Sequence, residues 1–223
     1  MVRSHLRESA HSMSKLRTRS KENLPSVVLT LLSIIQALAF TAFWEKALSH
    51  LQQYPEMSFQ GVVGWGQVVA TFFAILIIWL MYVMAVIRFR WQPDVVDLMA
   101  PFLIGVLELS FIYNLSMDSV GLWFCCCAIL QIALHFHQHR MAVRARLDED
   151  NAEFFSLVSK ATRKFHLTSV GINIVLFSIG IWFSYSEQII WVISVVISMI
   201  IALQSRLIYS LSRGWNFSMN EQA

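Results

Sequence analysis

Short charged blocks divide the chain into apolar runs, each about 20 residues long, the length that crosses the hydrocarbon core of a bilayer as an α-helix. Of its 223 residues, 57% are hydrophobic and only 14% are charged. A soluble domain usually carries about a quarter charged residues. The sequence therefore predicts an all-α, polytopic membrane protein and excludes a soluble core.

The apolar runs predict six transmembrane helices. Pro25 suits the first turn of the first helix, because the amide that proline lacks would have no partner there. The basic segment 1–24 before it is expected to be a short interfacial helix or a disordered tail. Ala37-Leu-Ala39 resembles a signal-peptide cleavage site, but the apolar run continues to Trp44, which favours an uncleaved span. The expected spans are residues 25–44, 67–87, 97–117, 120–138, 167–186 and 188–211.

Residues 139–166, between the fourth and fifth spans, combine many charges with an apolar stripe. This pattern predicts one amphipathic helix that lies on the membrane surface or against the bundle. We expect this cytoplasmic segment to be where a soluble partner would bind. The stripe consists of Phe154, Phe155, Leu157, Val158 and Ala161.

The distribution of lysine and arginine indicates which side of the membrane each connection faces. Six spans and a cytoplasmic N-terminus place every one of the 17 lysines and arginines except Lys46 in, or next to, the cytoplasm. Cytoplasmic connections of membrane proteins carry such an excess of basic residues. We therefore expect both termini in the cytoplasm and the protein in a bacterial inner membrane. The cytoplasmic segments are then residues 1–24, 88–97, 139–166 and 212–223, with Arg206 near the inner end of the last span.

A reporter that is active only in the cytoplasm tests this orientation. We expect a fusion after Glu56 to be inactive, because residues 45–66 form the longest outward connection. A fusion after Ala223 should be active in the same cells, and it serves as the expression control. An active reporter at Glu56 would contradict the predicted orientation.

One face of the third expected span carries residue types that hydrocarbon disfavours. Asp97, Pro101, Gly105 and Glu108 are spaced i, i+4, i+8 and i+11 and form one stripe along a helix. Asp97 can cap the helix start, where a carboxylate accepts from free amides. Glu108 lies about 16 Å further along, near the middle of the bilayer. A carboxylate at that depth costs at least about 2.5 kcal/mol on insertion scales, so it should face protein or water.

Two glutamine side chains are expected at the same depth in the bilayer as Glu108. Gln36 on the first span and Gln131 on the fourth lie at matching heights, and Gln131 shares a helix face with Cys127 and His135. We predict a midplane cluster of Gln36, Glu108 and Gln131 that opens inward past His135. Such a cluster serves either as a pathway for ions or protons or as hydrogen-bonded glue between helices. The candidate pathway residues are Gln36, Asp97, Glu108, Asn114, Gln131 and His135, with Asn173 as a further extension.

The sequence His135-Phe-His137-Gln-His139 raises the question of a metal site. His135 and His139 share a helix face while His137 points elsewhere, and no third ligand follows at a dependable spacing. An interfacial anchor or a pH-sensitive patch is the simpler interpretation, so we expect no metal and no other cofactor. The consecutive cysteines 125–127 are expected to pack as small apolar side chains.

Function is less constrained than fold. No phosphate-binding glycine loop, nucleophile elbow or zinc-protease motif occurs, so we expect no enzyme. The net charge of +3 arises from residues that flank the spans, which indicates a lipid bilayer and not nucleic acid as the partner.

Two hypotheses of function follow. The first is a small ion or proton channel or transporter, built as a homo-oligomer or within a membrane complex, whose polar path is lined by Glu108. The second is a membrane-embedded interaction or sensory subunit, in which the basic N-terminus and residues 139–166 recruit a partner. In that second case the buried polar groups are only structural.

Overall fold

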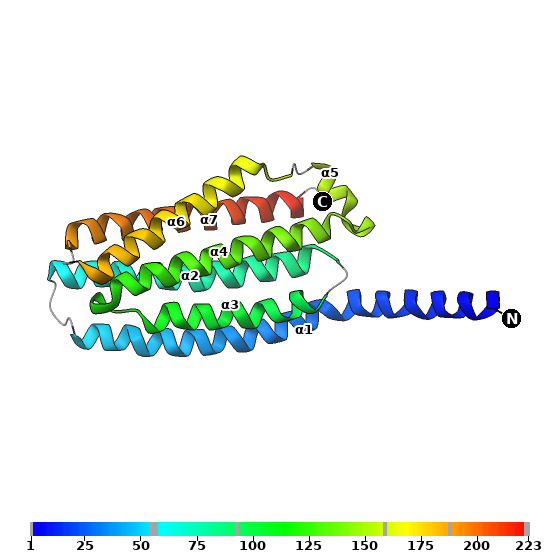
Figure 1. Cartoon of the computed structure of the whole chain (residues 1–223), viewed down its shortest axis with the longest axis horizontal. Coiled ribbons are helices and arrows are strands. Elements are labelled where there is room, and N and C mark those ends of the chain that lie inside the picture. Colours follow the sequence, from blue (N-terminus) through cyan, green and yellow to red (C-terminus); the bar gives the residue numbers. More distant parts are fainter. Residues whose placement is uncertain (1, 54–57, 92–93, 158–159, 187–188, 221–223) are drawn as a thin grey trace.

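The computed structural model describes the chain except for residues 1, 54–57, 92–93, 158–159, 187–188 and 221–223. Of residues 2–14, 16–17, 51, 157 and 214–220 it describes the backbone alone. Every regular element within the described ranges is a helix (Figure 1). In chain order they are α1 (Val2–Gln53), α2 (Phe59–Arg88), α3 (Val95–Tyr113), the 3-10 turn η1 (Met117–Ser119), α4 (Val120–Ala145), the 3-10 turn η2 (Glu149–Asn151), α5 (Ala152–Leu157), α6 (Arg163–Tyr185) and α7 (Ile190–Asn220).

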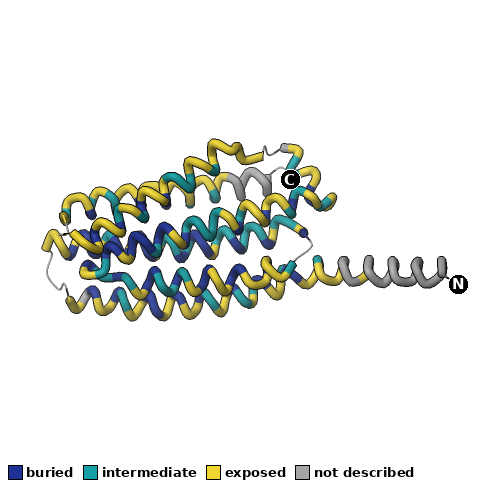
Figure 2. Tube along the Cα trace, in the orientation of Figure 1, coloured by how far each residue is buried: buried dark blue, intermediate teal, exposed yellow. Residues whose placement is uncertain are grey.

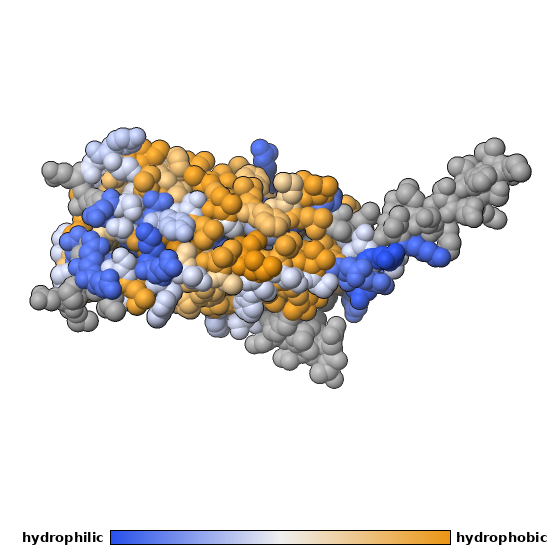
Figure 3. Space-filling view, turned by 90° about the horizontal axis from the view of Figure 1, so that it is seen from below, coloured by the Kyte–Doolittle hydropathy of each residue, from blue (hydrophilic) through white to orange (hydrophobic). Residues whose placement is uncertain are grey.

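Six of the described helices are long and apolar enough to cross a membrane, which confirms the number of spans predicted from the sequence. They lie side by side in one elongated bundle (Figure 1). Figure 3 shows hydrophobic side chains along the middle of one face and hydrophilic side chains toward both ends. This distribution matches a bilayer, so the chain is an integral membrane protein. We name the two ends of the bundle after their connections, the α2–α3 end and the α3–α4 end.

Helix α1 begins well before the apolar run, and Pro25 lies inside it and not in its first turn. Residues 2–24 are therefore continuous with the first span, where a separate interfacial helix or a tail was expected. Proline within a helix costs about 3 kcal/mol, because one backbone hydrogen bond is lost. The flanking residues Leu24 and Val28 are buried in one cluster with Met141 of α4 at the α2–α3 end, and this burial offsets the loss.

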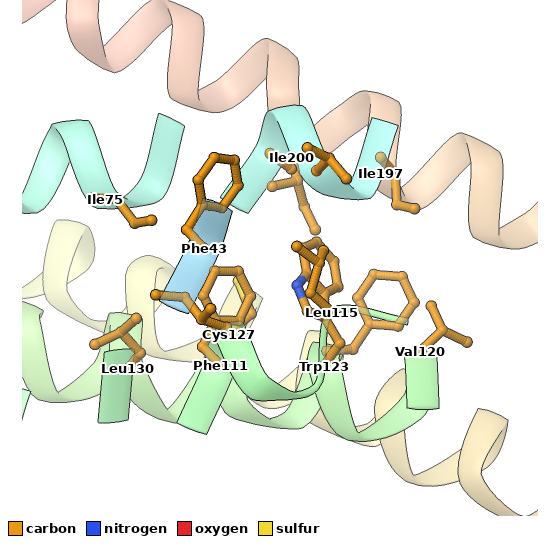
Figure 4. Close-up of a cluster of buried hydrophobic side chains, with 14 of the residues drawn as sticks. Phe43, Ile75, Phe111, Leu115, Val120, Trp123, Cys127, Leu130, Ile197 and Ile200 are labelled. Atoms are coloured by element: carbon orange, nitrogen blue, oxygen red, sulfur yellow. The ribbon is translucent and has the colours of Figure 1, made fainter. Parts of the chain in front are cut away.

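The largest core side chains lie toward the α3–α4 end. Phe111, Trp123 and Phe124 are fully buried there, and the ring centroids of Phe111 and Trp123 are 5.0 Å apart (Figure 4). The indole N–H of Trp123 donates to Thr71 Oγ1 at 3.1 Å, so the one polar atom of this side chain is satisfied. Figure 2 shows buried residues along the inward sides of α2, α3 and α4, which form the centre of the bundle.

Each helix packs against particular neighbours in the bundle. Helix α4 packs most extensively against α6, and α2 against α7, while α1 contacts both α2 and α3. Helices α6 and α7 follow each other in the chain but make little contact, and Figure 1 shows them crossing at an angle in this view. Each of them is therefore fixed to the bundle through a different helix.

Helices α4 and α6 come close together at Gly121 and Gly180. A Cβ atom on Gly121 would lie 2.7 Å from the Gly180 carbonyl oxygen, and one on Gly180 would lie 2.7 Å from the Cys125 sulfur. Both distances are shorter than van der Waals contact. In lipid, small residues permit this approach and gain dispersion contacts between the two backbones.

Replacing Gly180 by alanine should push α4 and α6 apart and lower the free energy of unfolding by about 1–3 kcal/mol, the usual effect of overpacking. Gly171→Ala is a matched control on the same helix, because no atom lies within 4 Å of a Cβ added there. Thermal unfolding in detergent, followed by circular dichroism, measures both variants. Equal unfolding midpoints would contradict the steric contact at Gly180.

The segment 139–166, predicted as one amphipathic helix, is divided among several elements in the structure. Helix α4 continues through its first part to Ala145. The turn η2 follows, α5 is only six residues long, and α6 begins at Arg163. The segment is therefore a compact connection and not one long surface helix over its described residues.

Side-chain hydrogen bonds explain this division. Asp148 accepts from the Asp150 amide and caps η2, which starts a new element. The Asn151 side chain accepts from the Arg90 amide at 3.0 Å and donates to the Arg90 carbonyl oxygen at 2.5 Å. Such side-chain bonds offer the backbone an alternative to a continuous helix. They also fasten η2 to the connection between α2 and α3.

Candidate functional site

Gln36 and Glu108 meet between α1 and α3. The Gln36 side-chain amide donates to both carboxyl oxygens of Glu108, at 3.0 and 3.2 Å. Both side chains are buried, Glu108 completely, and Pro101 and Gly105 of the same helix are buried as well. Hydrogen bonds between membrane helices contribute about 0.6–2 kcal/mol. This one ties α1 to α3 and removes the polar stripe of α3 from lipid.

Asp97 belongs to a cluster of charges at the α2–α3 end. Asp94, and not Asp97, is the N-cap of α3, and the two residues exchange hydrogen bonds of 3.1 Å in a capping box. Arg144 of α4 donates to Asp97 at 2.6 Å, and Arg140 pairs with Asp94. Desolvation opposes the charge on Asp94, but the Asp97 amide and the two guanidinium groups outweigh it and lower the pKa of Asp94. The cluster joins the start of α3 to the end of α4.

Asn114 and Gln131 lie apart from the Gln36–Glu108 pair. Asn114 is the C-cap of α3, and its side chain donates back to a carbonyl oxygen of that helix. Gln131 donates to the sulfur of Cys127 on its own helix, at 3.1 Å. Among the described residues, no hydrogen bond links Gln131 to Glu108. Of the predicted cluster of three residues, the structure therefore brings together only Gln36 and Glu108 among the described hydrogen bonds.

His135 contacts a histidine that the sequence did not connect with it. His135 Nε2 and His166 Nδ1 are 3.0 Å apart, and Ser169 Oγ lies 3.3 Å from His135 Nδ1. The His139 ring packs edge-on against His166 with a centroid distance of 4.4 Å, whereas His137 packs toward α2. Over the described parts of the chain, no group of three His, Cys, Asp or Glu side chains is arranged to hold a metal ion. The contacts join α4 to α6.

A cavity of about 420 Å³ lies between α2, α4, α6 and α7. Most of its lining is aliphatic, and none of the described side chains that line it is Asp, Glu, Lys or Arg. Three of its six polar residues were singled out in the sequence, whereas Gln138, Ser169 and, in α7, Gln204 were missed. For Gln204, its position as a lone glutamine deep within the last apolar run was the available signal. The polar lining residues are Gln131, His135, Gln138, Ser169, Asn173 and Gln204.

Asn173 and Gln204 each leave one buried oxygen without a hydrogen-bond donor among the described residues. Asn173 Nδ2 donates to the Ser169 carbonyl oxygen at 2.9 Å, and Gln204 Nε2 donates to the Ala70 carbonyl oxygen at 3.0 Å. Turning either amide around would place oxygen against oxygen, so these contacts fix both orientations. The cavity is therefore lined by two residues that can each still accept a hydrogen bond.

Comparisons with protein-family models, with curated proteins and with solved structures find no match for this chain. A six-span helical bundle does not by itself assign an activity, because one fold hosts many functions. The side chains of the cavity and of the buried Gln36–Glu108 pair are therefore the features that bear on function.

Gln36→Met should lower the free energy of unfolding by about 1–3 kcal/mol, because the buried Glu108 carboxyl loses its donor. Gln131→Met should cost less, since that glutamine donates only to a thiol of its own helix. The double variant Gln36→Met/Glu108→Met should recover part of the loss, because replacing both partners leaves no unsatisfied group. Unfolding in mixed micelles measures all three. A Gln36→Met variant as stable as Gln131→Met would contradict a stabilising pair.

Proposed function

We propose that the protein is a small membrane transport protein whose substrate path passes through the cavity between α2, α4, α6 and α7, in a bacterial inner membrane with both termini in the cytoplasm. The observation that carries the proposal is a set of polar side chains in an otherwise apolar cavity within the bundle. Binding sites in helix bundles are commonly apolar cavities with a few convergent polar groups. The cavity volume falls within the usual range for small-molecule sites.

The cavity is a better candidate for the substrate path than the surroundings of Glu108. The Glu108 side chain is completely buried, and its carboxyl group is bound by Gln36. It is not among the residues that line the cavity. An ion or proton path beside Glu108, one of the two roles expected from the sequence, would have to open this contact. In our proposal Glu108 fastens α1 to α3, and Gln131 and His135 contact the substrate.

The proposed path has one closed side. Phe111 both lines the cavity and stacks on Trp123 of the aromatic core. The cavity runs along α4 from Gln138 to Cys127 and stops at this aromatic layer. Transport across the whole membrane therefore requires the layer to open, whereas His135 and His166 lie near the opposite end of the cavity.

Cysteine accessibility tests the path in a variant that lacks the native cysteines. We expect Gln131→Cys to react with N-ethylmaleimide in the membrane, because its side chain lines the cavity. Glu108→Cys should stay unmodified, as should Ile75→Cys, a fully buried core control outside the cavity. Quantitative mass measurement of each variant gives the modified fraction. A reactive cysteine at 108 beside an unreactive one at 131 would overturn the proposal in favour of the Glu108 path.

A second candidate function is that of an interaction or sensory subunit, and the connection between α4 and α6 favours it. Phe89 stacks on Phe155 with a centroid distance of 5.2 Å, and Lys21 pairs with Asp148 at 2.5 Å. These contacts hold exposed acidic residues such as Glu149 and Glu153 in place at the α2–α3 end. A basic cytoplasmic partner would find a preformed surface there. Loss of such a partner on charge reversal of Glu149 and Glu153, without any change in cavity labelling, would support this function.

A further inference from the structure

We infer that the cavity binds an uncharged amphiphile, an aliphatic molecule with a hydroxyl head group, which enters from the bilayer between α6 and α7. The inference deepens the proposed function and rests on it, because it names the substrate class of the same cavity. It is carried by three features of the lining: where the cavity opens, which charges are missing, and which atoms lack a partner.

The cavity opens toward lipid between α6 and α7, which make little contact with each other. Helix α6 is held by α4 and α7 by α2, and the two make little contact with each other. Ile172 and Val175 of α6 and Met199 and Leu203 of α7 line the cavity, and each is more than half exposed. These four apolar side chains form the rim. A rim of this composition faces the hydrocarbon layer, so a ligand can enter from the bilayer without passing through water.

The lining selects an uncharged ligand. The described side chains around the cavity include no Asp, Glu, Lys or Arg, and His135 is the one among them that can become a cation by binding a proton. A charged ligand would lose its hydration in an aliphatic cavity and gain no opposite charge in return, which costs several kcal/mol. Aliphatic residues from all four helices suit a hydrocarbon chain instead.

Two lining residues call for a hydrogen-bond donor. Asn173 Oδ1 and Gln204 Oε1 are buried without a donor among the described residues, and the two residues are only 4% and 9% exposed. Their amide nitrogens are already engaged with Ser169 and Ala70, so only the oxygens remain to be paired. Both oxygens are covered in this structure, so a ligand hydroxyl reaches them once neighbouring side chains shift. It then donates one hydrogen bond and satisfies an acceptor that an alkane or an ether leaves unpaired.

A second copy of the chain suits this cavity less well. The backbone amides of a membrane helix are bonded within the helix itself, so an apolar helix has no donor to offer these oxygens. A small amphiphile brings both the donor and the aliphatic body. Its size also fits, since about 420 Å³ corresponds to a small-molecule cavity.

Photolabelling in phosphatidylcholine vesicles tests the inference with the full chain. The probe is a long-chain alcohol that carries a diazirine, and the matched probe is its methyl ether, which cannot donate. We expect the alcohol to label peptides of α6 and α7 on the order of 2- to 10-fold more than the ether, the effect of one hydrogen bond. Unlabelled alcohol should compete, and it should raise the thermal unfolding midpoint more than the ether does.

Variants identify the atoms responsible. In Asn173→Leu/Gln204→Met, labelling by the alcohol should fall to the level of the ether. Gln67→Met is the matched control, because Gln67 is also a buried glutamine with an unpaired Oε1, but it does not line the cavity. It should keep the full preference for the alcohol. Equal labelling by both probes, or a preference that survives the double variant, would overturn the inference, as would a cross-link between two copies through α6 and α7 that excludes both probes.

A transport measurement separates the two proposals. Transbilayer movement of a fluorescent long-chain alcohol should be faster in vesicles that contain the protein than in protein-free vesicles. In vesicles that contain the Asn173→Leu/Gln204→Met variant, it should be slower than with the unchanged protein. Donor-dependent labelling without faster movement would retain the binding site and refute transport. A reactive Gln131→Cys without any preference for the alcohol would retain the path and refute the substrate class.

Discussion

Hydrocarbon offers no hydrogen bonds, and the structure depends on the way the bundle meets this constraint. A buried carboxyl group within a membrane span must have its hydrogen-bond partner inside the protein. Glu108 accepts hydrogen bonds from Gln36, and this contact places α1 against α3. Trp123 finds Thr71 in the same manner and joins α4 to α2. Interhelical polar contacts thus determine which helices are neighbours, while apolar side chains fill the space between them.

Helices α6 and α7 are attached differently. Close contact at Gly121 and Gly180 holds α6 to α4, and the His135–His166 contact adds a polar bond between the same two helices. Helix α7 is bonded to α2 through Gln204 and Ala70. Because each of the two helices has its own support, they need not contact each other. The cavity with its aliphatic rim is the consequence, and its unpaired amide oxygens are what make it a candidate binding site.

The α2–α3 end shows how charge is used outside the hydrocarbon layer. Asp94 and Asp97 cap α3 and bind Arg140 and Arg144 of α4. Exposed ion pairs contribute little on their own, about 0–1 kcal/mol each. Here Asp97 is buried, and it exchanges hydrogen bonds with Asp94 at the helix start. The cluster therefore serves mainly to orient the ends of α3 and α4. Asn151 fastens the following connection to Arg90 in a similar way.

The sequence by itself determined the helical fold class and the number of apolar spans, because apolar length and the rise of 1.5 Å per residue are local properties. The Gln36–Glu108 contact was predicted correctly for that reason. Depth does not determine the rotation of a helix or the identity of its neighbours. Gln131 lines the cavity and does not bond to Glu108, and His166 is distant from His135 in sequence.

Only the tertiary structure decided those matters, together with the length of α1 and the division of residues 139–166 into short elements. Long-range contacts fix them: glycine against glycine between α4 and α6, and Asn151 against the α2–α3 connection. The cavity is the clearest case. Four helices that are separate in the chain surround it, so no local pattern could reveal that Asn173 and Gln204 line one space.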